Sequence, residues 1–126
     1  MNEANVNAIR NALLYMAARY HQISYRSEMF DDGAITDLAV TAERNAQRLS
    51  NTIGTDGITT AEDAALATGA VSALVDSMNT ELQKLHSRGQ VNDAALVEHR
   101  IRECYDAMAA VSVIARGMVQ VGAVTA

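Results

Sequence analysis

Proline is absent from all 126 residues of this sequence, and this absence constrains the fold more than any other feature. Because proline is the residue that most often ends or kinks a helix, the chain can form long helices without interruption. Apolar residues also recur in alternating steps of three and four, which places them on one face of a helix. In the first segment these residues are Val6, Ile9, Leu13, Met16, Tyr20 and Ile23, with Phe30 one heptad further on. The pattern predicts an all-α protein.

The same spacing divides the chain into four segments, separated by short stretches with the composition of turns. We expect four helices within a single domain of residues 1–126, at residues 3–30, 34–52, 60–88 and 92–121. Gly89 is expected to close the third helix in the left-handed conformation, and Asn92 to cap the fourth. The short connection makes the last two helices a long antiparallel hairpin, and the whole is predicted to be an up-down helical bundle.

The start of the third helix carries a capping signal. Thr59 with Glu62, or Thr60 with Asp63, has the spacing of a capping box. Either pair can satisfy backbone N–H groups that the first helical turn leaves without partners. The sequence therefore places the start of this helix within one or two residues but leaves the choice between the two pairs open.

Composition and charge exclude several classes of protein. Hydrophobic residues make up 49% of the chain, enough for a buried core, and charged residues make up 20%. The formal net charge of −5 disfavours a protein that binds nucleic acid or an anionic membrane by overall attraction. With Cys104 as its one cysteine, the chain forms neither an internal disulfide nor a cysteine zinc site. We expect Cys104 to lie buried as a small apolar group.

The two ends of the chain indicate a cytoplasmic protein. Residues 1–5 lack the basic and apolar regions of a secretory signal. Residues 107–126 are apolar and about as long as a membrane span, but Arg116 would lie in the middle of the bilayer. We therefore expect a buried bundle helix there, and no membrane as a partner.

Motifs that would indicate an enzyme or a metal centre are missing. The residues three positions before the histidines are Ala18, Gln83 and Leu96, so the Glu-x-x-His pairs of a di-iron bundle do not occur. His99 and Glu103 share a helix face, but no further ligands follow nearby. The sequence also contains no nucleophile elbow and no phosphate-binding glycine loop. We expect a protein without catalytic activity, metal or cofactor.

A helix-turn-helix is the DNA-binding alternative. The positions of that motif within residues 60–79 are occupied by Ala65, Gly69, Val75 and Met78. Its second helix would carry Asp76 and no lysine or arginine, which opposes contact with phosphates. One continuous helix that tolerates the glycine is the competing interpretation, and we do not expect nucleic acid as a partner.

The positive charges are unusual because nine of the ten are arginine and Lys84 is the one lysine. Arginine binds carboxylate and phosphate groups through two parallel hydrogen bonds and stacks on aromatic rings. Arg19, Tyr20, Tyr25 and Arg26 lie close together in the sequence. They form a candidate site for a small anionic or nucleotide-like ligand. A core position for Tyr20 and arginines paired with nearby acids would explain the same residues.

Unequal helix lengths indicate an interaction surface. The second helix is about nine residues shorter than the last two, so about 13 Å of their length lacks a neighbour from it. Apolar surface left uncovered in this way is usually buried by a second copy or another protein. The candidate residues are Met118, Val119, Val121 and Val124. A tail that folds back, or a first helix that covers the gap, is an equal alternative.

These observations favour a small, cytoplasmic, non-enzymatic interaction protein, comparable in role to adaptors, chaperones or inhibitors. It would present an apolar helical face to a second copy of itself, as a homo-oligomer, or to another protein. Binding of a small anionic ligand by the arginine and tyrosine cluster is the alternative from a different functional class. DNA-binding regulation is the least favoured of the three.

Overall fold

The computed structural model describes the backbone of residues 1–125 and the side chains of residues 1–119. Its four α-helices are α1 (Glu3–Met29), α2 (Gly33–Thr52), α3 (Ala61–Ser87) and α4 (Val91–Thr125). The described residues contain no strand, so the predicted all-α fold class is confirmed. Each helix begins within one residue of its expected start. The largest difference is at the end of α4, which continues past residue 121.

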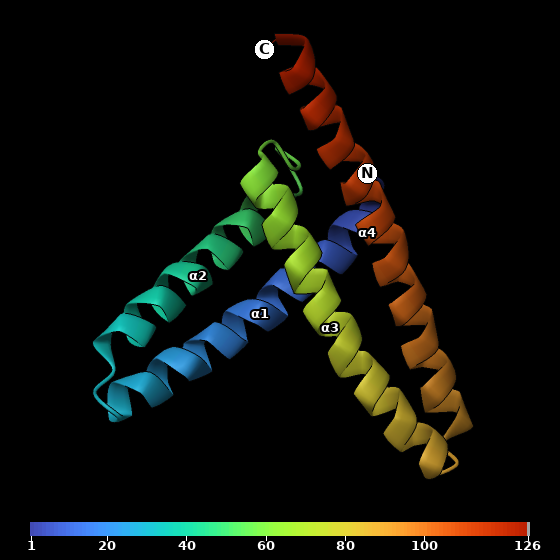
Figure 1. Cartoon of the computed structure of the whole chain (residues 1–126). Helices are drawn as coiled ribbons and strands as arrows, with labels where there is room; N and C mark the ends of the chain where they lie inside the picture. The colour runs from blue at the N-terminus through green and yellow to red at the C-terminus, as the bar shows by residue number, and fades with distance from the viewer. Residues whose placement is uncertain (126) are drawn as a thin grey trace.

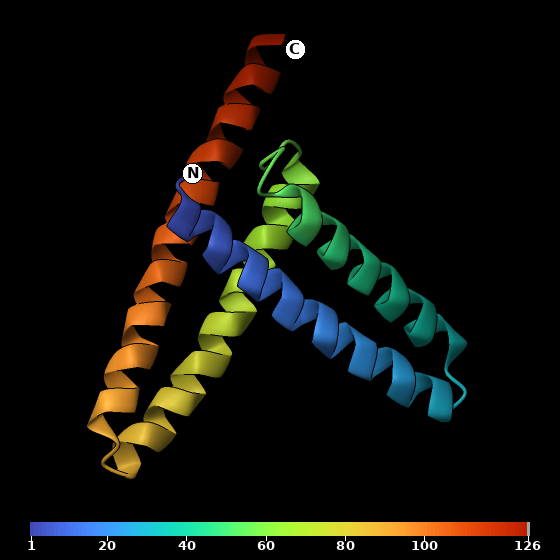
Figure 2. The ribbon, with the colours of Figure 1, turned by 180° about the vertical axis from the view of Figure 1, so that it is seen from behind.

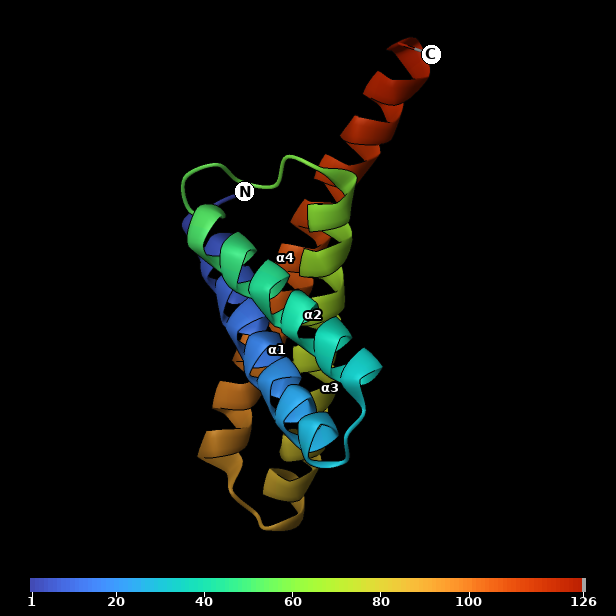
Figure 3. The same cartoon turned by 90° about the vertical axis from the view of Figure 1, so that its left-hand side faces the viewer.

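The helices form two antiparallel pairs that cross each other (Figure 1). α1 lies along α2 and α3 lies along α4, and α1 also contacts both helices of the second pair. The view from behind shows the same crossing (Figure 2), and the side view shows the α1–α2 pair as a layer against the α3–α4 pair (Figure 3). This arrangement differs from the expected up-down bundle, whose four helices would lie along one common direction.

Side chains at the crossing explain the difference. Six large side chains are almost fully buried there and come from all four helices and the end of α2: Ile9, Leu13, Leu49, Ile53, Val71 and Val111. Most of the other buried residues around them are alanines: Ala8, Ala12, Ala17, Ala46, Ala64, Ala67, Ala70 and Ala107. Alanine permits close approach of two backbones but contributes little apolar area. The pairs therefore pack tightly where they cross, with little to hold them together further along.

The two tight turns have different chemistry. Between α1 and α2, Asp31 adopts a left-handed conformation with φ of 58°, and the Asp32 carboxylate accepts a hydrogen bond from the backbone N–H of Ile35. Between α3 and α4, Gly89 has φ of 68°, as the sequence predicts. The prediction for Asn92 is wrong, because α4 begins at Val91 and Asn92 already lies inside its first turn.

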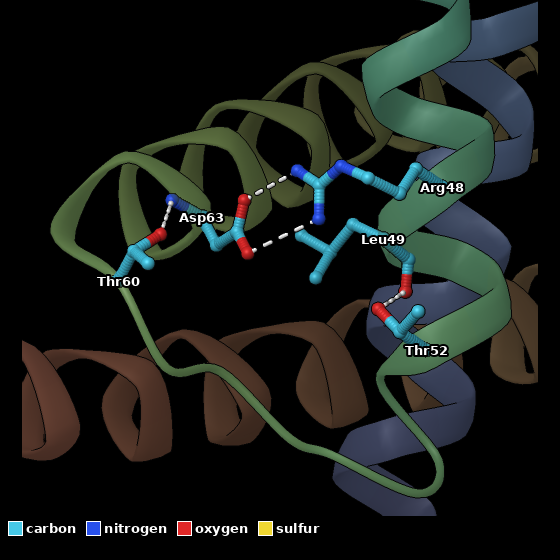
Figure 4. A network of polar contacts seen from close by, with 5 residues as sticks. All are labelled: Arg48, Leu49, Thr52, Thr60 and Asp63. Atoms are coloured by element: carbon cyan, nitrogen blue, oxygen red, sulfur yellow. Dashed lines mark hydrogen bonds and ion pairs between the residues drawn. The ribbon is translucent and has the colours of Figure 1, made fainter.

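Thr60 and Asp63 fix the start of α3 (Figure 4). The backbone N–H of Asp63 donates to the Thr60 hydroxyl at 3.1 Å, so Thr60 is the N-cap of α3, but the expected capping box forms only this one of its two hydrogen bonds. The Asp63 carboxylate accepts two hydrogen bonds from Arg48 of α2, at 2.7 and 3.4 Å. The hydrogen bond to Asp63 raises the pKa of Arg48 above its usual range. This pair joins the end of α2 to the start of α3 across the connection of residues 53–60.

Two further expectations concern the long helices. α3 is continuous through Gly69, so the turn that a helix-turn-helix requires is not formed. Within the described residues, none of the helices has both the length and the apolar character needed to cross a bilayer.

The Arg48–Asp63 pair generates a stability prediction. Asp63 is buried while half of the Arg48 side chain is exposed, so we expect Asp63→Asn to lower the free energy of unfolding by about 1–2 kcal/mol. Arg48→Gln should lower the free energy of unfolding by less than Asp63→Asn, because the Arg48 guanidinium group is already partly hydrated. Chemical denaturation of both single variants and the double variant gives the coupling energy, expected at about 1 kcal/mol.

Arg44→Gln is the matched control, since Arg44 lies one turn earlier on α2 and forms no ion pair among the described side chains. A coupling energy near zero, or an equal loss in the Arg44 variant, would show that this pair does not hold α2 to α3.

Candidate functional site

A groove of about 870 Å³ lies in the angle between α1 and the second half of α3, and we call it the α1–α3 groove. α1 contributes Tyr15, Met16, Arg19 and Ile23 to its wall; α3 contributes residues 73–84 in part, including Ser77 and Lys84; α4 contributes Val97 and Arg100. The groove exists because the helix pairs cross, since helices that ran side by side would fill this space.

Tyr15 and Arg19 form a local pair on the wall of the groove. Their four-residue spacing places them on neighbouring turns of α1. Arg19 Nη1 donates to the Tyr15 hydroxyl oxygen at 2.8 Å, and the guanidinium carbon lies 5.7 Å from the centre of the tyrosine ring. Hydrogen bonds from Ser77 of α3, and to a lesser extent from Arg19, lower the pKa of Tyr15. The pair therefore brings an N–H donor and a hydroxyl group together on the wall of the groove.

Positive charge reaches the groove from three helices. Arg19 comes from α1, Lys84 from α3 and Arg100 from α4. None of these three forms an ion pair among residues 1–119. Asp76 and Glu81 of α3 also line the groove, so its wall carries charges of both signs with an excess of cations.

The arginine and tyrosine cluster expected from the sequence is only partly brought together. Arg19 lines the α1–α3 groove, whereas Tyr20, Tyr25 and Arg26 do not. Tyr20 is half-buried, and Tyr25 and Arg26 are exposed on the part of α1 beyond the crossing. The groove combines Arg19 with residues that are far away in the sequence. The four-residue spacing of Tyr15 and Arg19 was a signal that could have found Tyr15.

Beyond the crossing, α1 and α2 form an arm that projects from the α3–α4 pair (Figure 1) and comprises residues 18–45, between Ala17 and Ala46 of the core. Small residues fill the space between its two helices: Ser24, Ser27 and Ala39 are buried. The hydroxyls of Ser27 and Thr36 lie 2.7 Å apart and share a hydrogen bond. Small side chains draw the two helices close together, so larger side chains have no room between them.

The large apolar side chains of the arm lie on its outside. Ile23, Phe30, Ile35 and Leu38 have exposed fractions of 42%, 81%, 46% and 72%, and we call these four residues the arm surface. Phe30 was expected on the buried stripe of α1. That prediction is wrong, because the stripe is covered only where α1 crosses α3 and α4.

The arm surface continues a helix face that is buried at the crossing. Along α1, Ile9 is fully buried, Met16 packs against the core, and Ile23 and Phe30 follow at intervals of one heptad. Along α2, Ile35 lies two heptads before the fully buried Leu49. Residues one heptad apart lie on nearly the same side of a helix. The same face of each helix is therefore buried at the crossing and exposed on the arm.

The C-terminal surface expected from the sequence is described only in part. Met118 packs partly against the core, and Val119 is 73% exposed. Val121 and Val124 lie outside the residues whose side chains are described. The helix itself continues to Thr125 and extends past the start of α3 (Figure 3), so its backbone does not fold back. Whether these residues form an interface stays a prediction.

Residues with metal-binding or nucleophilic chemistry are not gathered into a centre. His99 Nε2 lies 2.9 Å from Glu103 Oε1 on the exposed side of α4. No group of three potential metal ligands occurs among the described residues. Cys104 is buried, as the sequence predicts, and burial raises the pKa of its thiol. A raised pKa keeps the thiol protonated and weakly nucleophilic.

Comparison of this chain with models of protein families, with curated proteins and with solved structures gives no match.

The hydrogen bonds of Tyr15 predict the pH at which its hydroxyl group ionises. The lowered pKa means that one tyrosine of the folded protein should ionise below the ordinary value of 10.0, and Tyr15→Phe should remove that step. The folded state then favours the phenolate form of Tyr15. The free energy of unfolding should therefore increase as the pH rises through the lowered pKa, and the full contribution of Tyr15 should be present above pH 10. Ultraviolet absorbance at rising pH measures the ionisation, with Tyr25→Phe as the exposed control. Equal titration of both variants would contradict the geometry at Tyr15.

Proposed function

We propose that this protein is a non-enzymatic helical interaction protein that associates with a second copy of itself through the arm surface. The observation that carries the proposal is the continuous face of α1 and α2, which belongs to the buried core at the crossing, where α1 packs against α3 and α4, and is uncovered on the arm. An apolar helix face that is buried along one part and exposed along the next is typical of a surface that a partner protein buries.

The composition of the arm supports this proposal. In a hairpin that is stable on its own, the large apolar residues usually lie between the helices. Here serine, threonine and alanine occupy that place, and the four residues of the arm surface are exposed, as are Tyr25 and Met29. Burial of a large apolar side chain stabilises by about 1.5–3 kcal/mol when it is fully exposed beforehand.

Charge favours one arrangement of the two copies. Asp31 and Asp32 lie in the turn at the end of the arm, with Glu28 and Asp37 close by in the sequence. Contact between two such ends would bring like charges together. An antiparallel overlap of two arms separates these acids and keeps the apolar residues in contact. Such a pair has the two-fold symmetry of most homodimers.

The test is the mass of the protein in solution. Wild-type protein is expected to sediment with twice the 13.5 kDa mass of one chain. Ile35→Ser combined with Leu38→Ser should shift the protein to single chains and weaken association at least about tenfold, because two exposed apolar side chains of each copy are lost. Circular dichroism should show unchanged helix content, since both side chains are exposed in the single chain.

Tyr25→Ser combined with Met29→Ser is the matched control. These residues are 63% and 68% exposed on the same arm, but 100° per residue places Tyr25 about 160° and Met29 about 120° around α1 from Ile23. This variant should keep the wild-type mass. Single chains in the wild type at about 100 µM, or equal loss of association in both double variants, would refute self-association through the arm surface.

A further inference from the structure

The α1–α3 groove has features of a ligand site, and Ile23 is the one residue that it shares with the arm surface. Its volume of about 870 Å³ lies within the usual range for small-molecule sites. Met16, Met78 and Val97 are half-buried in its wall and provide an apolar floor. Methionine side chains adapt to ligands of irregular shape.

The cations of the groove are available to a ligand. Arg19 donates a hydrogen bond to Tyr15, which uses one of its five N–H donors and leaves the other four for a ligand. Lys84 and Arg100 face the same groove from the other two helices, and neither is neutralised by an ion pair within residues 1–119. Three cations from three helices converge on one space next to the ring of Tyr15.

The acids of the groove limit what can bind. Asp76 and Glu81 lie on the α3 side and would repel an extended polyanion such as a nucleic acid. A small ligand can avoid them by placing its anionic group near Arg19 and Arg100. It can also donate hydrogen bonds to them from hydroxyl or amino groups.

We infer that the α1–α3 groove binds a small amphipathic anion, which has an aromatic or aliphatic body and one phosphate or carboxylate group. The body lies on Met16, Met78 and Val97. The anionic group accepts hydrogen bonds from Arg19 and Arg100, with Lys84 adding charge. The Tyr15 hydroxyl and ring border the junction between the two parts of the ligand.

The experiment uses phenyl phosphate as the probe, and inorganic phosphate and phenol as its two halves. Binding is measured by calorimetry and by the shift of amide resonances in the full-length protein. Phenyl phosphate should bind, and each half alone should bind at least about tenfold more weakly. Phenylacetate in place of phenyl phosphate distinguishes a carboxylate ligand from a phosphate ligand.

Single substitutions test which arginines bind the anionic group. Arg19→Gln and Arg100→Gln should each weaken phenyl phosphate binding about tenfold, because each removes a charge-assisted hydrogen bond. Arg26→Gln is the matched control, since Arg26 is an exposed arginine of the same helix that does not line the groove. It should leave binding unchanged. The Ile35→Ser, Leu38→Ser protein should still bind phenyl phosphate, and Arg19→Gln should still weaken that binding in the single chain, which separates this inference from self-association.

Three results would overturn the inference. The first is that neither phenyl phosphate nor phenylacetate binds at millimolar concentration. The second is that inorganic phosphate binds as tightly as phenyl phosphate, which would mean that the apolar floor contributes nothing. The third is that Arg26→Gln weakens binding as much as Arg19→Gln, which would mean that overall charge and not the groove attracts the anion.

Discussion

The close packing of α1 on α3 and α4 through alanines is the contact on which the rest of the structure depends. Ala12, Ala67 and Ala107 are completely buried where the two helix pairs meet, and larger side chains there would push the backbones apart. Close approach is stabilising over a short overlap only, because alanine has little apolar area to bury. The two pairs therefore cross instead of lying side by side. The α1–α3 groove and the uncovered arm both follow from that crossing.

Much of the secondary structure could be predicted because its signals are local. Gly89 ends α3 through a conformation that glycine adopts easily, and Thr60 caps α3 with its own side chain. The capping pattern could not decide how the Asp63 carboxylate is used. It pairs with Arg48, which is 15 residues earlier in the chain. Partners of this kind depend on how α2 meets α3, which no local spacing encodes.

The crossing and the groove could not be predicted from the same patterns. Steps of three and four place Ile9, Ile23 and Phe30 on one side of α1, but they do not say how far along the helix that side is covered. The sequence indicated Arg19 through its neighbours Tyr20 and Arg26, and the structure instead combines it with Lys84 and Arg100. Those two residues lie on other helices, so their approach to Arg19 depends on the angle between the pairs.

Ile23 connects the two proposals, because it lines the α1–α3 groove and also belongs to the arm surface. A ligand that covers part of this side chain changes the apolar area left for a second copy. Thermodynamic linkage then requires a reciprocal effect: the ligand changes the affinity between copies by the same factor by which association changes the affinity for the ligand. The sign depends on whether the ligand fills a gap beside Ile23 or displaces the partner from it. Measurement of the mass in solution with and without phenyl phosphate determines that sign directly.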